Sequence, residues 1–382
     1  MNNFEFYNPV RIIFGKNTIL KLSKLISPDF KNILLVYGGG SIKSNGVYDQ
    51  IMNALAQRNV IEFSGVEANP DFDTLMKAVS ICREEKIDFI LAAGGGSVID
   101  GVKLIAAGAH FEGDPWDILA KRGKVKSALP FGTVLTLPAT GSEMNSGSVV
   151  SRRALGAKLV FQSEHVFPVF SILDPETTRT LPVSQLANGI IDAFIHVCEQ
   201  YITNDVSAVL QYHQSEAVLK TLIEIAETVM GGFDYDSRAA FMWAATNALN
   251  GTVGVGVPQD WATHVIGHEL TALYGLDHAV TLAIVQPGVW QTCFEAKKAM
   301  LARYGRNVWN LSGDDTSVAH LAMEKTDEFY RSLGVLTTLS EHGVDTEKLP
   351  IVAEKFASYG YNPGENSDLT PEKITKLLNS RI

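Results

Sequence analysis

The stretch FILAAGGGSVID, residues 89–100, determines how the rest of the chain is interpreted. Phe89–Ala93 is a short apolar run with an aspartate before it and glycines after it, which predicts a buried β-strand. Gly94–Gly96 and Ser97 follow, and Val98–Ala109 has the periodicity of a helix. A buried strand that passes through a glycine turn into a helix is typical of α/β sheets, which bind ligands at the carboxyl ends of their strands.

Strands and helices alternate on both sides of this stretch. We predict strands at Ile33–Tyr37, Thr133–Leu137 and Phe170–Leu173, and helices at Val47–Gln57 and Asp71–Lys86. Such alternation predicts a parallel sheet with helices on both of its faces. A separate β-hairpin is predicted at Gly147–Val150 and Lys158–Phe161, because two apolar segments flank a polar turn there.

Helical periodicity replaces the strand signals from about residue 184 onward. The predicted helices are Val183–Thr203, Val206–Met230, Tyr235–Asn250, Gln259–Leu273, 278–292, 294–309, 317–332 and a short one from Thr370. Two prolines, Pro175 and Pro182, interrupt the periodicity at the junction between the halves. We therefore expect an α/β domain at residues 1–183 and an all-helical domain at residues 184–382.

The composition argues against several classes of protein. Hydrophobic residues make up 46% of the 382 residues, which is enough for a packed core. The net charge of −10 argues against binding to nucleic acid or to an anionic membrane, since phosphate binding requires clustered lysine and arginine. The sequence has no run of about 18 apolar residues and no secretory signal. Its three cysteines form no CxxC or disulfide pattern, so we expect a cytoplasmic protein.

A second glycine cluster follows another predicted strand. Gly38-Gly39-Gly40-Ser41 follows Ile33–Tyr37 in the same way that Gly94-Gly95-Gly96-Ser97 follows Phe89–Ala93. Glycines let a backbone approach a phosphate closely, and a helix N-terminus offers free N–H groups. Neither cluster has the lysine of a P-loop, and Ile99 occupies the third glycine position of GxGxxG. A phosphate-bearing cofactor is the expected ligand, and two plain tight turns are the alternative.

Metal-ligating residue types cluster in the helical half. Asp192 and His196 are four residues apart on a predicted helix, so both lie on one face. His264 and His268 repeat this spacing on another helix, and His278 follows. An aspartate and three histidines provide one oxygen and three nitrogens, a set suited to Zn²⁺ or Fe²⁺.

Three stretches together resemble the group III, or iron-containing, alcohol dehydrogenase family. They are GGGSVID at residues 94–100, the run from Asp174 to Glu199 that contains Asp192 and His196, and the His264-x₃-His268-x₉-His278 pattern. Within the family, the chain looks closest to the bacterial NADPH-dependent broad-range aldehyde reductases, also called butanol dehydrogenases. The resemblance implies a dehydroquinate-synthase-like fold, with a Rossmann-like dinucleotide-binding domain followed by a helical metal-binding and catalytic domain.

The resemblance also implies roles for particular residues. The metal ligands would be Asp192, His196, His264 and His278, and His268 would be a catalytic histidine beside the nicotinamide. The cofactor would contact the Gly95-Gly96-Ser97 turn with Asp100 nearby, a hydroxyl-rich loop that contains Thr136, Thr140 and Ser142, and Lys158 near the nicotinamide ribose. With the first glycine turn included, the expected cofactor-binding residues are Gly38, Gly39, Gly40, Ser41, Asn69, Gly95, Gly96, Ser97, Asp100, Thr136, Thr140, Ser142, Lys158, Thr178 and Leu181.

The first glycine turn indicates a preference for NADP(H). NAD-preferring members of the family carry an aspartate at the end of the first strand, where it would repel a 2′-phosphate. Here that position is Tyr37-Gly38-Gly39-Gly40-Ser41, without an acid, and Lys43 is close in sequence.

We therefore expect an NADP(H)-dependent oxidoreductase that interconverts small aldehydes and primary alcohols, chiefly as an aldehyde reductase. The expected metal is Zn²⁺, with Fe²⁺ second, because zinc binds such sites more tightly in the usual divalent order. A homodimer that pairs through a strand at Val10–Phe14 is also expected. The rival functions are an NAD-dependent glycerol or diol dehydrogenase, a dehydroquinate-synthase-like lyase and a non-catalytic nucleotide-binding protein. The segment Gly334–Ser367 shows no pattern tied to chemistry.

Overall fold

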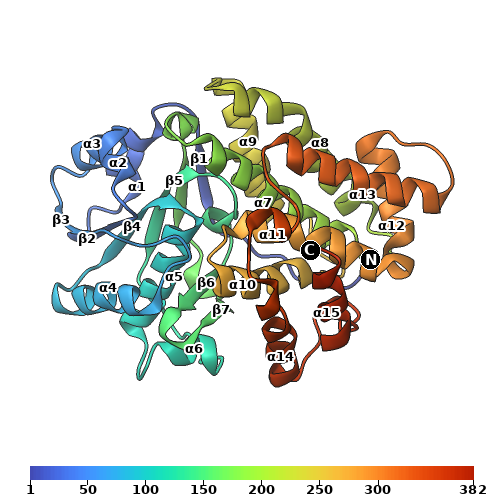
Figure 1. Ribbon diagram of the computed structural model, residues 1–382. Helices are drawn as coiled ribbons and strands as arrows, with labels where there is room; N and C mark the ends of the chain where they lie inside the picture. Colours follow the sequence, from blue (N-terminus) through green and yellow to red (C-terminus); the bar gives the residue numbers. More distant parts are fainter. The chain divides into compact units, whose positions relative to one another are not determined.

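The computed structural model describes residues 1–382, and the chain forms two compact units (Figure 1). The first, here called the α/β unit, consists of Tyr7–Pro182 and Phe233–Thr246. The second, the helical unit, consists of Met1–Phe6, Val183–Gly232 and Asn247–Ile382. Most of α9 (Tyr235–Ala248) thus belongs to the α/β unit, although its sequence lies within the helical half.

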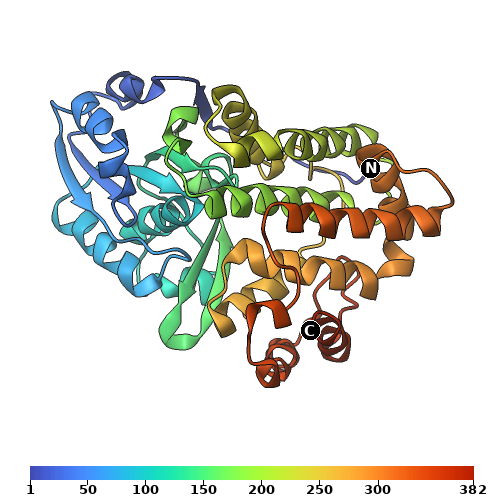
Figure 2. The same ribbon diagram turned by 45° about the horizontal axis from the view of Figure 1, so that its top comes forward.

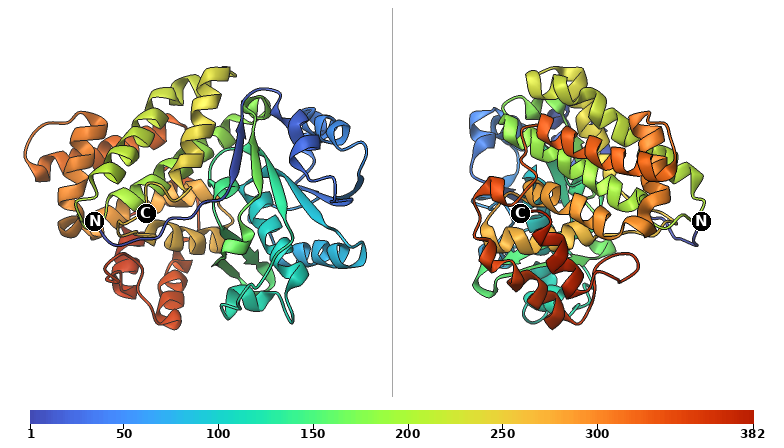
Figure 3. Two further views of the ribbon diagram at one scale, coloured as in Figure 1. Left: turned by 180° about the vertical axis from the view of Figure 1, so that it is seen from behind. Right: turned by 45° about the vertical axis from the view of Figure 1, so that its right-hand side comes forward.

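The α/β unit is built on six parallel strands in the order β1-β8-β5-β4-β2-β3 (Figure 3, left). The strands are β1 (Arg11–Phe14), β2 (Asn32–Tyr37), β3 (Asn59–Phe63), β4 (Phe89–Gly95), β5 (Phe131–Leu137) and β8 (Phe170–Leu173). The predicted hairpin is confirmed as the antiparallel pair β6 (Gly147–Arg152) and β7 (Ala157–Gln162). Strand β3 was not predicted, because it is an edge strand of mixed polarity with no buried residue.

Both faces of the parallel sheet are buried, as the near-continuous apolar runs predict. Along β2, Leu34 and Val36 join one core cluster, and Ile33 and Leu35 join the other. Helices α4 and α5 pack in the first cluster, and α3 packs in the second. The helices of the unit are α1 (Leu22–Leu25), α2 (Ser41–Ser44), α3 (Val47–Ala54), α4 (Phe72–Glu84), α5 (Gly96–His110) and α6 (Trp116–Ala120).

The helical unit surrounds α7, which is buried along nearly its whole length after its first turn (Figure 2, α7 in green). Its helices are α7 (Val183–Tyr201), α8 (Val209–Gly231), α10 (Ala262–Tyr274), α11 (His278–Thr292), α12 (Phe294–Trp309), α13 (Asp315–Ser332), α14 (Pro350–Tyr359) and α15 (Pro371–Asn379). The predicted bounds of α11 and α12 are confirmed. None of the helices combines the length and the hydropathy that a membrane crossing requires.

The segment 334–382 supplies the packing behind α10. Helices α14 and α15 share one core cluster with α10 and α11, through residues such as Val352, Phe356 and Leu377. On the surface, the Lys355 ammonium lies 2.6 Å from the Glu269 carboxylate of α10. Residues 334–367, which carry no recognisable motif, therefore hold in place the helix that bears His264 and His268.

Candidate active site

Three helices of the helical unit bring the predicted metal ligands together. Asp192 and His196 come from the middle of α7, His264 from the first turn of α10, and His278 is the first residue of α11. The Asp192 Oδ1 atom lies 3.6 Å from His196 Nδ1, 3.6 Å from His264 Nε2 and 3.7 Å from His278 Nε2. Four ligands at about 2.0–2.1 Å from a tetrahedral metal stand about 3.4 Å apart. Ligand atoms of Asp192, His196 and His264 lie within 4.8 Å of one another, which is compatible with a single ion, whereas His278 is not part of that compact group.

The donor atoms fit a metal because no protein group satisfies them. Asp192 Oδ1, His196 Nδ1 and His264 Nε2 are buried and have no hydrogen-bond partner. Separations of 3.6 Å are too long for hydrogen bonds between these side chains. Buried polar atoms without partners cost several kilocalories per mole, and a cation held between them would remove that cost. A divalent metal therefore matches both the spacing and the chemistry of this set.

Glu199 orients His264 from the side opposite the metal position. The Glu199 Oε2 atom accepts a short hydrogen bond from His264 Nδ1, and Oε1 accepts from the His264 backbone N–H at 3.2 Å. This bond fixes the imidazole so that Nε2 faces Asp192. A carboxylate that accepts from the second nitrogen of a ligating histidine is the usual support of such ligands.

Asp192 and His196 carry the charges that a metal site needs, whereas His264 holds a proton that a bound ion would displace. Burial lowers the pKa of His196 to about 4, so its imidazole is neutral at pH 7 and can donate a lone pair. Burial acts to raise the pKa of Asp192, but the histidines around it hold that pKa well below its usual range. Burial acts to lower the pKa of His264, whereas Glu199 and Asp192 raise it, with a net value of about 9. The site thus combines one carboxylate with imidazoles.

His268 lies next to this cluster. It is half-buried on α10, one turn after His264, and the centroid of its ring is 6.2 Å from that of His264 and 5.0 Å from that of His278. It is not part of the compact group of candidate ligands, which consists of Asp192, His196 and His264. Its catalytic role remains a prediction.

The glycine turns lie at strand ends of the α/β unit. Gly38–Gly40 follow β2, and Gly94–Gly96 join β4 to the N-terminus of α5. A Cβ atom at Gly96 would stand 2.3 Å from Thr140 Oγ1, so the α5 N-terminus packs directly on the loop after β5. At Gly39 a Cβ atom would meet nothing within 4 Å. The first residue of α5 must therefore be small, whereas position 39 faces open space.

The structure connects several of the predicted cofactor residues to one another. The Lys158 ammonium donates to Asn69 Oδ1 at 2.8 Å, and the Asn69 backbone N–H donates to Ser97 Oγ at 3.3 Å. Asn69 is held at φ 55°, a left-handed conformation that asparagine tolerates better than most residues. Residues from β7, the loop before α4 and the start of α5 thus meet beside the glycine turn.

Other predicted cofactor residues make intramolecular contacts. Ser142 is buried, and its hydroxyl donates to Asp100 Oδ1 at 2.5 Å. The buried Thr178 hydroxyl donates to the Pro175 carbonyl at 2.7 Å. Thr136 is also buried, and Leu181 is partly exposed. The contacts of Asp100, Ser142 and Thr178 support the loops in which they lie, and their contact with a cofactor remains a prediction.

An acidic residue that the sequence did not indicate lies near the first glycine turn. Glu62 of β3 accepts hydrogen bonds from Tyr37 and Tyr48 at 2.7 and 2.6 Å, and it pairs with Lys43 at 3.0 Å. The hydrogen bonds from Tyr48 and Tyr37 lower the pKa of Glu62 to about 2. Strand β3 was not predicted from the sequence, and the pairing between Glu62 and Lys43 was therefore not predicted either.

Glu199 and Lys103 were not predicted as functional residues either, although the sequence contains a pattern that indicates each of them. Asp192, His196 and Glu199 stand at i, i+4 and i+7, so all three share one face of a helix. Lys103 is the only charged residue in the apolar stretch from Gly101 to Ala109. A lone charge within an apolar helix face indicates a buried polar contact.

Two models of one protein family match nearly the whole chain. Residues 9–175 match the family model for iron-containing alcohol dehydrogenase, and residues 186–382 match the C-terminal model of the same family. The chain therefore belongs to the iron-containing alcohol dehydrogenase family, and it is an oxidoreductase acting on alcohols and aldehydes. The predicted family and fold class are confirmed.

The chain is similar over its full length to named members of the family. It is 50% identical over 376 residues to the NADPH-dependent aldehyde reductase YqhD of Escherichia coli, with 97% of each chain covered. It is 40% identical to the probable NADH-dependent butanol dehydrogenase 1 of Bacillus subtilis, with 100% of each covered. A crystal structure of YqhD matches 100% of this chain and 99% of that one, with a TM-score of 0.97 and 48% identity. An NADH-dependent butanol dehydrogenase A from Thermotoga maritima matches with a TM-score of 0.96 and 33% identity, over 100% and 99% of the two chains.

Proposed function

We propose that the protein is an NADP(H)-dependent, metal-dependent reductase of small aldehydes, which it converts to primary alcohols. The observation that carries the proposal is the compact group of Asp192, His196 and His264, whose ligand atoms lie within 4.8 Å of one another and include three buried atoms without a partner, with His278 Nε2 3.7 Å from Asp192 Oδ1. Such a set has no structural use in an empty state, and it suits a divalent cation that binds an aldehyde oxygen.

The chain's own residues would hold the reactants and move one proton. A bound metal would polarise the aldehyde, and NADPH would supply the hydride. Asp192, His196, His264 and His278 would hold the metal, and Glu199 would keep His264 in the ligating orientation. Reduction of an aldehyde by a hydride requires one proton at the oxygen, and His268 is a histidine outside the ligand set whose ring centroid lies 5.0 Å from that of His278. We assign His268 the role of proton donor, directly or through water.

The α/β unit would bind the cofactor. The turns at Gly38–Ser41 and Gly95–Ser97, with the loop 136–142, present backbone N–H groups and hydroxyls of the kind that hold phosphates. We assign NADP(H) as the preferred cofactor, because the first turn itself carries no acid and the Lys43 that follows it on α2 balances the charge of Glu62. The NADPH-dependent relative of 50% identity supports this choice, whereas the NADH-dependent relative of 40% identity makes a direct comparison of the two cofactors necessary.

The proposed metal is Zn²⁺, with Fe²⁺ second. One carboxylate and three imidazoles suit either ion, and zinc binds such sites more tightly. The family is named for iron. Elemental analysis of protein purified without added metal decides between them. Iron as the dominant metal in active protein would overturn the choice of zinc without affecting the reductase assignment.

We also propose a homodimer that forms at the β1 edge of the sheet. Ile12, Phe14, Ala239, Ala240 and Trp243 line an apolar surface hollow of about 320 Å³. Phe14 and Trp243 are 41% and 43% exposed, and β1 is an edge strand, which offers its backbone to a second chain. Phe14→Asp should convert the dimer to a monomer in light scattering. Val160→Asp is the matched control, since Val160 is an exposed apolar residue elsewhere in the same unit.

The reductase assignment is tested with the purified holoenzyme. Oxidation of NADPH is followed against a panel of aldehydes of increasing length, and NADH is run in parallel. We expect turnover with several aldehydes and a clear preference for NADPH. Equal kcat/KM values for both cofactors would contradict the NADP assignment, and no turnover with any aldehyde would contradict the reductase assignment.

Two histidine variants test the division of roles. His264→Ala should lose both metal and activity, because it removes a ligand. His268→Ala should retain metal and lose about 10²–10⁴-fold in kcat, the usual contribution of a proton donor. Loss of metal from His268→Ala would instead assign that residue to the ligand set.

A further inference from the structure

Helix α5 carries a lysine where its pattern calls for an apolar residue. Lys103 has no solvent exposure, and its neighbours Val102, Leu104 and Ile105 all belong to the core. Only one other lysine, Lys297 of the helical unit, is buried. Burying an ammonium group is costly, and apolar residues in such positions often give equal or greater stability. A lysine here therefore calls for an explanation other than stability.

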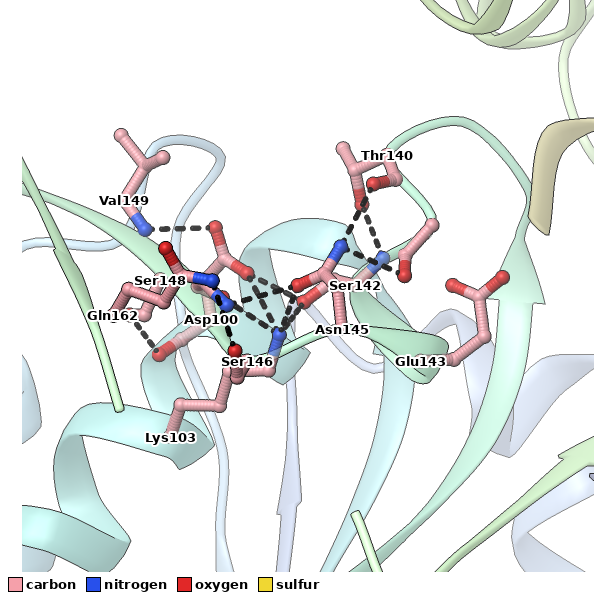
Figure 4. A network of polar contacts seen from close by, with 12 residues as sticks. Asp100, Lys103, Thr140, Ser142, Glu143, Asn145, Ser146, Ser148, Val149 and Gln162 are labelled. Atoms are coloured by element: carbon pink, nitrogen blue, oxygen red, sulfur yellow. Dashed lines mark hydrogen bonds and ion pairs between the residues drawn. The ribbon is translucent and has the colours of Figure 1, made fainter. Parts of the chain in front are cut away.

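The Lys103 ammonium binds one loop with all of its donors. It donates to Ser142 Oγ at 2.8 Å, to Asn145 Oδ1 at 2.9 Å and to the Gly147 carbonyl at 2.6 Å (Figure 4). An ammonium group has three N–H donors, so its capacity is filled. Burial lowers the pKa of Lys103 to about 8, which leaves it charged at neutral pH. Lys103 is thus not available to bind a phosphate directly.

Asp100, one turn earlier on α5, also forms hydrogen bonds with this region, at Ser142, Ser148 and Val149. Its Oδ1 accepts from Ser142 Oγ, and its Oδ2 accepts from the Val149 backbone N–H at 3.0 Å. Its backbone carbonyl accepts from Ser148 Oγ at 2.8 Å. Ser142 therefore bridges Lys103 and Asp100, whose nearest charged atoms are 3.9 Å apart (Figure 4).

The loop 140–147, held by Lys103 and Asp100, also packs against the first turn of α5. Asn145 Nδ2 donates to the Gly141 carbonyl at 2.9 Å, and the Ser142 backbone N–H donates to Thr140 Oγ1 at 3.2 Å. Thr140 in turn fills the space beside Gly96, where a Cβ atom would stand 2.3 Å away. The contacts of Lys103 therefore set the position of Thr140 relative to the N-terminus of α5.

We propose that Lys103 is a positioning residue for the cofactor, which holds the loop 140–147 against the first turn of α5 so that both backbone segments can face the phosphates of NADP(H). This inference rests on the proposed function, because it assigns the two segments to the cofactor. An apolar side chain at position 103 would fill the same space, but it would leave the loop free to take other positions. The predicted loss is in cofactor affinity, with the metal site unaffected.

The test compares Lys103→Met, which keeps the length of the side chain, with the wild-type holoenzyme. Binding of NADPH is measured by the change in its fluorescence, and kcat is measured at saturating NADPH. We expect the Kd for NADPH to rise about tenfold or more, the kcat to stay within about threefold, and the metal content to stay unchanged. Lys297→Met is the matched control, since Lys297 is also buried and binds two carboxylates and a carbonyl. It should lower the melting temperature without raising this Kd.

Asn145→Ala removes one of the Lys103 contacts from the side of the loop. If Lys103→Met does not fold, this variant tests the inference in its place. If both act through the loop, the double variant should raise the Kd by less than the product of the single effects. A Lys103→Met protein that binds NADPH as tightly as wild type, or a Lys297→Met protein that loses as much affinity, would overturn the inference. A wild-type protein that binds no NADPH would instead contradict the proposed function.

Discussion

Each of the two nitrogens of the His264 imidazole faces a different carboxylate. Glu199 accepts from Nδ1, and Asp192 faces Nε2 at 3.6 Å. The first contact is a hydrogen bond, whereas the second is too long for one and leaves Nε2 available to a metal. Because Glu199 also accepts from the His264 backbone N–H, it fixes the residue at two points. The ligand is therefore oriented before any ion binds.

Glu199→Gln should weaken metal binding while the protein stays folded. Glutamine can accept from Nδ1–H, but its amide group would then face the His264 backbone N–H donor, and the negative charge is lost. We expect a fall of about 10–100-fold in affinity for zinc, measured by competition with a chromophoric chelator. Glu216→Gln is the control, since Glu216 is a buried glutamate of the same unit that contacts Tyr201, Arg303 and Asn307. Equal affinities in wild type and Glu199→Gln would show that Glu199 is not needed for ligation.

Gly39→Asp should shift the cofactor preference toward NADH. Position 39 does not require a positive φ, and an added Cβ meets no atom within 4 Å, so the backbone can accept a side chain. A carboxylate there would repel the 2′-phosphate. We expect the ratio of kcat/KM for NADPH to that for NADH to fall by about tenfold or more. Gly39→Ala separates size from charge, and an equal loss in both variants would rule out the electrostatic explanation.

At the scale of the element, glycine sets how closely two helices approach. Helices α12 and α13 form an antiparallel hairpin, and Gly305 of α12 lies against α13. A Cβ atom at Gly305 would stand 2.7 Å from Val318 Cγ1 and 3.1 Å from the Ala322 methyl carbon. The hairpin depends on this small residue, because packed helices tolerate little added volume.

Gly305→Val should destabilise the protein by about 1–3 kcal/mol, the usual cost of overpacking a core. Chemical denaturation followed by circular dichroism measures the change. Gly231→Ala on α8 is the matched control, because a Cβ atom there meets nothing within 4 Å. The control should change the free energy of unfolding by less than about 1 kcal/mol. Equal stabilities in the two variants would show that the α12–α13 contact tolerates a larger side chain.

The elements that the sequence predicted well are those with strong local patterns. The strands β2, β4, β5 and β8 are short apolar runs, and their burial follows from the parallel sheet. The edge strand β3 has a weak pattern, since the exposed residues Asn59 and Glu62 interrupt its apolar residues and none of its residues is buried. Helix α14 was not predicted, and its apolar residues, such as Val352 and Phe356, pack in one core cluster with α10 and α11, a contact that no local pattern specifies.

The residues of the candidate site also fall into those with a local sequence pattern and those without one. The i, i+4 spacing of Asp192 and His196 is local and was visible, whereas the approach of His264 and His278 to Asp192 needed the family resemblance. The contacts of Lys103 join residues about 40 positions apart, and no local pattern specifies their partners. Sequence periodicity reports which face of an element is buried, but it does not report what lies against that face.

At the scale of the whole molecule, metal binding should stabilise the fold. The four predicted ligands come from α7, α10 and α11, so an ion would link three helices of the helical unit. A ligand present at about 1,000 times its Kd stabilises the native state by about 4 kcal/mol. We expect chelation to lower the melting temperature by several degrees and added Zn²⁺ to restore it. In His264→Ala this response should disappear, and its persistence would place the stabilising ion elsewhere.

The pairing of β1 with β8 also has a consequence for the synthesis of the chain. Strand β1 lies at the edge of the sheet, and its only neighbour is β8, which begins about 155 residues later. At about 5–20 residues per second, the ribosome delivers that partner roughly 8–30 s after the first strand has emerged. During this interval Ile12, Ile13 and Phe14 have no neighbouring strand in the nascent polypeptide. The earliest residues of the fold are thus among the last to be protected, and chaperones that shield emerging apolar segments should affect the yield of this enzyme.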